Sequence, residues 1–544
     1  MKIKSMLVGM LACTAMVSCT NDDVLEGGNN PAQNGERSYM AVNIVSANSG
    51  SRSTSTVTGD KYQDANEANE VKVGKVRFYF FDENGAAYKV TDKNNTNANY
   101  IEIENPKISE GSTANVDKKT PSVLVIEQSK VAPPKSVVAV LNSDKLATDL
   151  ADEMSLAELT AKVCNDQNGI AGTGENEFIM TNSVYVDSRK ETMVATPISI
   201  DDIQHSEDAA KANPVNIYVE RVLAKVTTEL KNQNKTDGYK PEDKSGVYSI
   251  GAEFGGKKVF AKINGWQITN YNDNSTLFKS LNDEPNFTWT WNAPADFRSF
   301  WANSADPTDG TTGNNASYKN PYKFNEIGST NVKYCLENTS DNPTKLLVAA
   351  TLLNEDGEAL DIAQWMGVKY TVADLKTQLA GTLASEYFYF DESDKKYKSI
   401  TAEHIDFLNP DNTWAANEKR YEVYACLAKG APQFYTKKAD GTGMNEVAAS
   451  VINDKLDTYP VRVWTEGATY YYVNIAHLGG LDAVVRNHWY NISINSISGF
   501  GTPVYDGDDI IFPQVPDNDK DTYIAAEINI LSWKVVSQDV ELGQ

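Results

Sequence analysis

Runs in which apolar and polar residues alternate recur along most of the chain after residue 38. This two-residue period is typical of β-strands, because successive side chains of a strand point to opposite faces of a sheet. Turn-forming dipeptides such as Asp356-Gly357 separate the runs. The clearest runs are 122–127, 136–142, 215–230, 345–360, 420–428 and 468–478.

Two segments have a helical pattern instead. Residues 155–163 begin with a capping box formed by Ser155 and Glu158. Residues 371–384 begin with Thr371, which is the predicted N-cap. Many strands, few helices and no regular alternation of strand with helix predict an all-β fold of two tandem β-sandwiches.

The first predicted strand, "SYMAVNIVS" at residues 38–46, stands apart from the others. Met40, Val42 and Ile44 alternate with polar residues and would share one face of the strand. A polar tether precedes the strand, and a polar segment from 47 to 70 follows it before dense β-pattern resumes. That segment contains "SGSRSTSTVTGD" with Arg52, the kind of exposed loop that a protease can enter.

The N-terminus predicts a lipoprotein signal peptide over residues 1–18. Two lysines precede an apolar stretch from about residue 6 to 17, and "MVSC" resembles a bacterial lipobox, which makes Cys19 the predicted lipidated residue. "MLAC" at Cys13 is a competing match with a shorter apolar region. Cys164, Cys335 and Cys426 are an odd, widely spaced set, which predicts buried thiols rather than a disulfide framework.

Composition and motifs argue against nucleic-acid binding and against catalysis. The formal net charge of −24, from 74 acidic and 50 basic residues, would repel phosphate backbones. The four histidines are scattered, and no hydrolase elbow, phosphate-binding loop or dinucleotide fingerprint is present. We therefore expect no enzyme activity, no cofactor and no metal; the acidic runs 506–509 and 517–521 are interpreted as linker rather than as calcium ligands.

An aromatic patch at residues 286–301 leaves one alternative open. Trp289, Trp291 and Trp301 could stack on sugars, which would make the chain a monomeric glycan-binding surface lipoprotein. The same alternation of tryptophans also suits packing in a sandwich core or an interface, because aromatic side chains bury large areas.

The C-terminal region predicts a long strand on a tether. Ile524, Ala526, Ile528 and Ile530 alternate, after which the pattern slips to Leu531, Trp533 and Val535, which indicates a bulge or a kink. The Pro- and Asp-rich segment 506–521 precedes this strand and could let it leave its own domain. A tethered terminal strand can complete the sheet of another chain by β-augmentation.

These motifs, in this order, resemble the type V fimbrilins of the Bacteroidota outer membrane, above all the shaft subunits of the short, Mfa-type fimbriae. The resemblance rests on the lipobox at Cys19, "SYMAVNIVSANSGSR", "SVVAVLN", "VERVLAKV", "INGWQI" with Trp266, "VVRNHWYNISINSISGFG" and "EINILSWKVVSQDVEL". It implies two transthyretin-like, Greek-key β-sandwiches and a role as a surface fimbrial subunit that supports adhesion. A tip or anchor subunit of the same system is a further alternative.

The resemblance also implies a mechanism of assembly. The precursor would reach the outer-membrane surface as a lipoprotein, and an arginine-specific or trypsin-like protease would cut after Arg52, so that Ser53 becomes the first residue. Loss of the first strand would open a groove for the C-terminal strand of a neighbouring subunit, about residues 523–542, and repetition would give a head-to-tail filament. Arg37 is a rival cleavage site, but cutting there would retain the strand.

The predicted boundaries follow from these assignments and from composition. They are a signal peptide at 1–18, a lipidated tether with a removable strand at 19–52, an N-terminal sandwich at 53–222, a C-terminal sandwich at 223–505, and a linker with a donor strand at 506–544.

Overall fold

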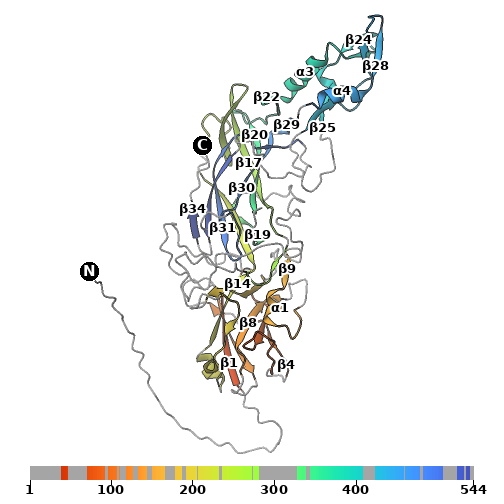
Figure 1. Ribbon diagram of the computed structural model, residues 1–544. Coiled ribbons are helices and arrows are strands. Elements are labelled where there is room, and N and C mark those ends of the chain that lie inside the picture. Colours follow the sequence, from red (N-terminus) through yellow and green to blue (C-terminus); the bar gives the residue numbers. More distant parts are fainter. Residues whose placement is uncertain are drawn as a thin grey trace, which may run out of the picture.

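Three bodies follow one another along the long axis of the molecule (Figure 1). The computed structural model describes residues 38–46, 70, 72–91, 96–106, 109–110, 118–126, 133–143, 150–165, 178–186, 192–204, 206–212, 214–231, 236–272, 274–280, 328–338, 343–408, 423–458, 460–477, 482–505, 523–531 and 535–538. Strands greatly outnumber helices in these residues, so the predicted all-β fold is confirmed.

The N-terminal body is built on one connected sheet of nine strands. Its order is β5 (Tyr100–Glu104), β2 (Lys75–Phe81), β8 (Ser136–Leu141), β10 (Met180–Asn182), β14 (Val215–Arg221), β1 (Ser38–Ser46), β7 (Lys118–Ile126) and β6 (Ser109–Glu110), with β13 (Thr196–Pro197) paired to β8. Smaller elements around it are β3 (Val90–Thr91), β4 (Asn97–Ala98), β11 (Tyr185–Val186), β12 (Thr192–Met193), α1 (Leu156–Thr160), η4 (Ile200–Asp202) and α2 (Glu207–Ala212).

Large apolar side chains from β2, β8, β10 and β14 form the core of this body. Phe78, Phe80 and Val138 are fully buried in it.

The N-terminus of α1 has the cap that the sequence predicts. The Ser155 side chain accepts from the Glu158 N–H, and the Glu158 carboxylate accepts from the Ser155 N–H, so the predicted capping box of α1 is confirmed.

The middle body is a two-sheet sandwich. One sheet has the order β19 (Gly328–Leu336), β15 (Leu223–Leu230), β31 (Trp489–Ser498), β33 (Tyr523–Leu531) and β34 (Val535–Gln538). The other has the order β16 (Val247–Phe254), β17 (Lys257–Thr269), β20 (Lys345–Leu353), β30 (Ala468–Asn474) and β32 (Thr502–Pro503). Inward side chains of both sheets, among them Val226, Trp266 and Tyr490, share one buried core.

A third, smaller body is inserted between β20 and β30, and the sequence patterns do not anticipate it as a separate unit. Its strands are β21 (Ile362–Trp365), β22 (Val368–Thr371), β23 (Phe388–Asp391), β24 (Lys396–Ser399), β25 (Ile405–Leu408), β26 (Tyr424–Leu427), β27 (Phe434–Lys437), β28 (Met444–Val447) and β29 (Val461–Trp464). Its helices are α3 (Val372–Leu383), α4 (Ala449–Leu456), η6 (Ala402–His404) and η7 (Thr465–Gly467).

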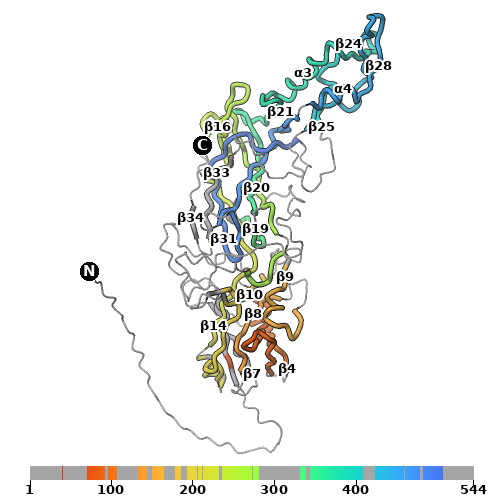
Figure 2. The backbone as a smooth tube through the Cα atoms, in the orientation of Figure 1, coloured from red at the N-terminus to blue at the C-terminus, as the bar shows by residue number. Residues whose placement is uncertain are grey.

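The insert has a core of its own, to which α3 contributes Leu375 and Leu379 and α4 contributes Ile452. The Thr371 side chain accepts from the Asp374 N–H, which confirms Thr371 as the N-cap of α3. Figure 2 shows the insert projecting at the end of the molecule away from the N-terminal body. No helix in the described ranges is long and apolar enough to cross a membrane.

One short pairing links the N-terminal body to the sandwich. Strand β9 (Val163–Asn165) pairs with β18 (Asn274–Thr276), which follows β17 of the sandwich. Strand β14 of the first body ends at Arg221 and β15 of the second begins at Leu223, so the chain passes directly from one sheet to the other. The two bodies therefore meet over a short connection, where charged side chains are buried.

Candidate assembly site

The first strand, β1, lies inside the N-terminal sheet rather than at its edge. It runs parallel to β14, with Val42 opposite Val215, and antiparallel to β7, with Ser38 opposite Ile126. Among the described residues, the hydrogen-bonded path from β14 to β7 passes through β1. Loss of β1 would thus leave two facing strands with unpaired backbone groups and an open slot between them.

Met40 anchors β1 in the core. Its side chain is fully buried and belongs to the same cluster as the phenylalanines of β2. Helix α2 packs against β1, and its Ala210 is also fully buried. The slot is therefore apolar at the Met40 position and is covered by a short helix.

The C-terminal strands lie on the sandwich of their own chain. Strand β33 runs antiparallel to β31 from Tyr523, opposite Ser498, to Leu531, opposite Trp489. A register shift interrupts the pairing between Ile494 and Ser496 of β31. The pair β33 and β34 ends this sheet, so it can leave without separating any of the other strands.

The prediction of one long strand with a bulge or a kink at the C-terminus is wrong. The structure has two strands, because β34 pairs antiparallel with β33, with Val535 opposite Leu531 and Gln538 opposite Ile528. The slip in the alternating pattern after Ile530 thus marks a reversal of the chain rather than a bulge within one strand. A change of phase in the pattern cannot by itself distinguish these two outcomes.

Several predicted site residues fall outside the described residues. These are Cys19, Arg37, Arg52, Ser53 and Trp533, the aromatic patch at 286–301, and the acidic runs at 506–509 and 517–521. Their predicted roles remain predictions. The structure does describe the backbone of both strands proposed for exchange, β1 and β33, each nine residues long.

A buried ion pair holds the chain immediately after the predicted cleavage segment. Glu70 is fully buried, and its Oε1 accepts hydrogen bonds from Lys225 Nζ at 2.6 Å and from the Tyr334 hydroxyl at 2.6 Å. Arg221 Nε donates to the Glu70 carbonyl oxygen at 2.6 Å, and Arg221 Nη1 donates to Asn487 Oδ1 at 3.2 Å. These partners come from β14, β15, β19 and the approach to β31.

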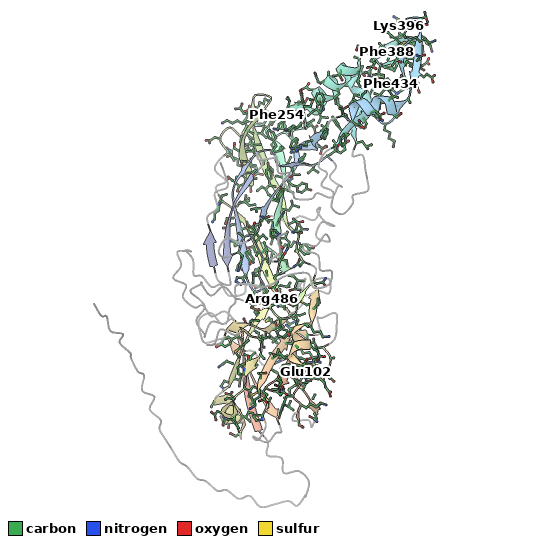
Figure 3. The ribbon with its side chains drawn as sticks, in the orientation of Figure 1. Glu102, Phe254, Phe388, Lys396, Phe434 and Arg486 are labelled. Atoms are coloured by element: carbon green, nitrogen blue, oxygen red, sulfur yellow. The ribbon has the colours of Figure 1, made fainter. Side chains whose placement is uncertain are left out.

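Two further buried ion pairs reinforce the same junction. Lys279 Nζ lies 2.9 Å from Glu220 Oε2, and Arg486 Nη2 lies 2.6 Å from Glu337 Oε1 (Figure 3 labels Arg486). Arg486 also donates to the carbonyl oxygens of Leu277 at 2.9 Å and Thr276 at 2.7 Å. Burial opposes the charge of Arg486, but the Glu337 carboxylate raises the pKa of this guanidinium above its usual value.

The sequence patterns do not predict this network, although they contain a signal of it. Glu220, Arg221 and Lys225 interrupt the apolar run 215–230, and Arg486 follows two valines in "VVRNHWYN". Charged residues inside strand patterns are expensive to bury unless they are paired, so such residues are candidates for a buried junction. The partners Glu70 and Glu337 are far away in sequence, which is why pattern alone could not pair them.

Comparison with known families gives one match. Residues 462–539 match the family model described as "Major fimbrial subunit protein type IV, Fimbrillin, C-terminal". This range includes β30, β31, β33 and β34, that is, the C-terminal strands and the strand on which they lie. No curated protein matches the chain.

Solved structures give weak likenesses over almost the whole chain. A putative cell adhesion protein from Parabacteroides distasonis ATCC 8503 is 14% identical over 93% of this chain and 99% of that one, with a TM-score of 0.36. The tip fimbrial protein Mfa3 from Porphyromonas gingivalis, truncated at its C-terminus, is 10% identical over 91% and 99%, with a TM-score of 0.32. These TM-scores are too low to support a conclusion about the fold or the function of this chain.

The family match falls on the segment that also supplied two of the sequence motifs, "VVRNHWYNISINSISGFG" and "EINILSWKVVSQDVEL". Residues 462–539 thus resemble the C-terminal region of fimbrilins, which agrees with the fimbrilin resemblance of the sequence motifs in this segment.

Proposed function

We propose that this chain is a structural subunit of a cell-surface fimbria that polymerises by strand exchange. The precursor would be lipidated at Cys19 and cut after Arg52, and β1 would leave the N-terminal sheet. A C-terminal strand from a neighbouring subunit would then fill the slot between β14 and β7. The observation that carries this proposal is the interior position of β1 between these two strands.

The energetics favour replacement over an empty slot. An empty slot would leave the backbone groups of β14 and β7 unpaired and the Met40 site unfilled. A strand of equal length with alternating apolar residues can restore both kinds of contact, and each large aliphatic side chain that it buries contributes roughly 1.5–3 kcal/mol before entropic costs. Nine-residue β33 has this length and this alternation.

The positions of the strands in the two sheets also support the proposed direction of transfer. Because β33 and β34 end the sandwich sheet, their departure leaves β19, β15 and β31 paired with one another. The donor and the acceptor slot lie in different bodies of the chain, so a subunit can donate its strand to one neighbour and accept a strand from another through a heterologous contact. Such contacts generate a filament in which each subunit donates one strand and accepts another.

Limited digestion of the purified precursor tests this proposal. We expect trypsin to produce a chain that begins at Ser53 and to start formation of ladders that resist denaturation. Arg52→Ala should block both, whereas Arg37→Ala should block neither. Ladders that form equally from the Arg52→Ala protein would contradict the cleavage step.

A matched pair of variants tests the donor. Ile528→Asp introduces a charge at one of the alternating apolar positions of β33, and Asn529→Asp introduces the same charge at the adjacent position of the same strand. We expect Ile528→Asp to cleave normally and remain monomeric, because a buried unpaired carboxylate is costly. Asn529→Asp should polymerise. Equal polymerisation of the two proteins would exclude β33 as the inserted strand.

A further inference from the structure

The inserted body contains a four-stranded sheet with one face on its core and one face outside it. The sheet has the order β24, β23, β27 and β28. On the inner face, Tyr389 and Phe434 lie against His404, with ring centroids 4.6 Å and 5.5 Å apart, and Phe434 belongs to the core of the insert. The alternation of the strands therefore directs the neighbours of these residues away from the core.

The outer face carries a row of aromatic side chains. Phe390 is paired with Tyr397, and Phe388 is paired with Tyr435. The Tyr397 ring stands edge-on to Phe390 and to Tyr435, with centroids 5.1 Å and 5.2 Å apart. Tyr397 is 45% exposed, and none of the four residues belongs to the core cluster of the insert. Figure 3 shows Phe388 at the far end of the insert.

Polar groups border this aromatic row. Lys437 Nζ lies over the Phe388 ring, 5.1 Å from its centroid. Within the described residues, the hydroxyl groups of Tyr397 and Tyr435 have no hydrogen-bond partner in the protein. Desolvation and the nearby Glu446 carboxylate raise the pKa of Tyr435, so its hydroxyl remains a donor at neutral pH. The face thus combines exposed ring surface with donors that a ligand can use.

The charges around the face are balanced, in contrast to the whole chain. Residues 388–399 hold three acidic and three basic residues, and residues 434–447 hold two of each. Lys398 pairs with Asp391 and, at 3.0 Å, with Asp394, so these carboxylates are already neutralised. The chain has a net charge of −24. A locally neutral aromatic face on a strongly acidic protein does not select a charged ligand.

We propose that the outer face of β23, β24 and β27 binds an uncharged glycan, whose sugar rings pack on Tyr397, Tyr435 and their phenylalanine neighbours. Sugars present apolar C–H surfaces and hydroxyl groups together, which match ring faces bordered by phenol hydroxyls. An acidic polysaccharide is disfavoured as the occupant because it and the chain would both carry a large negative charge.

Affinity electrophoresis and calorimetry of the full chain against soluble polysaccharides test this site. The probes are uncharged polymers of glucose, mannose or galactose and, in a separate arm, sulfated and uronic-acid polymers. We expect at least one uncharged polymer to bind. Tyr397→Ala should weaken that binding by about tenfold or more, as truncation of a central aromatic contact commonly does, and Tyr397→Phe should weaken it less.

The control variant is Val368→Ala, which removes an exposed apolar side chain of the same insert away from this face. It should bind like the unchanged chain. The proposal is overturned if no uncharged polymer binds, if only charged polymers bind, if Tyr397→Ala and Val368→Ala have equal effects, or if Tyr397→Ala instead abolishes self-association. Since the assay uses the uncleaved monomer, its result is independent of strand exchange.

Discussion

The first and the last strands of this chain occupy opposite kinds of position. Strand β1 is an interior strand with partners on both sides and a fully buried Met40, whereas β33 and β34 form the end of the sandwich sheet. Removing the first creates a defect within a sheet, while removing the second only shortens a sheet. Loss of β1 would therefore leave a slot that a strand from another subunit could fill, and the C-terminal strands could leave their own sheet to fill such a slot.

Separate removal of the two regions should have the largest effect. A chain that begins at Ser53 and lacks 506–544 has an empty slot, whereas a precursor that lacks only 506–544 retains β1. The N-terminal body of the chain with the empty slot should lose more stability than the roughly 2–5 kcal/mol that truncation of one core side chain costs. At about 2–4 °C per kcal/mol, its N-terminal unfolding transition should fall by roughly 10 °C or more.

Calorimetry measures this difference, because the N-terminal body and the sandwich have separate cores. The precursor that lacks 506–544 should keep the N-terminal transition of the full chain. Equal losses in the two truncated proteins would contradict the contrast between an interior and a terminal strand.

Breaking the buried ion pair between Glu70 and Lys225 should have the next largest effect on stability. Lys225→Ala leaves the Glu70 carboxylate buried without its cation, which costs about 3–5 kcal/mol in comparable pairs. Denaturant unfolding of the precursor measures the loss. The surface variant Lys240→Ala, which breaks exposed pairs with Glu355 and Asp356, should cost far less stability, because solvent screens exposed ion pairs. Similar losses in both proteins would show that the junction does not stabilise the chain.

Met40→Ala should destabilise the N-terminal body of the precursor by about 2–5 kcal/mol, because it leaves a cavity in the core. The same substitution should not change the stability of the mature polymer, since β1 has then been removed. Ile200→Ala is the control, because the Ile200 side chain is 49% exposed. An equal loss in precursor and polymer would mean that β1 stays in place.

Thiol reactivity provides the smallest and most local test. Cys164 lies in the N-terminal core and Cys335 in the sandwich core, both buried and outside any disulfide, and burial raises the pKa of Cys164 to about 12. In the precursor, both should react at least roughly tenfold more slowly than half-buried Cys426, because they react only after local opening. Cleavage without a donor should accelerate Cys164 but not Cys335, as mass spectrometry of labelled peptides would show.

Sequence patterns predict the strand-rich fold, both helix caps and the strand at 38–46, because these features depend on local alternation and short-range hydrogen bonds. Cys164 and Cys335 are buried as predicted, whereas Cys426, for which the same prediction was made, is only half-buried. The insert was not recognised as a separate body, since its short strands resemble those of the sandwich. Pairing of Glu70 with Lys225, and the reversal between β33 and β34, depend on contacts that one-dimensional patterns do not specify.

The most direct test of strand exchange is a reversible lock on the donor. Asn491 of β31 lies opposite Asn529 of β33, so cysteines at these two positions can join the strands by a disulfide. With Cys426→Ser as background, the oxidised protein should be cut after Arg52 and remain monomeric, and a reductant should start polymerisation. Polymerisation of the oxidised protein at the rate of the reduced protein would contradict the account.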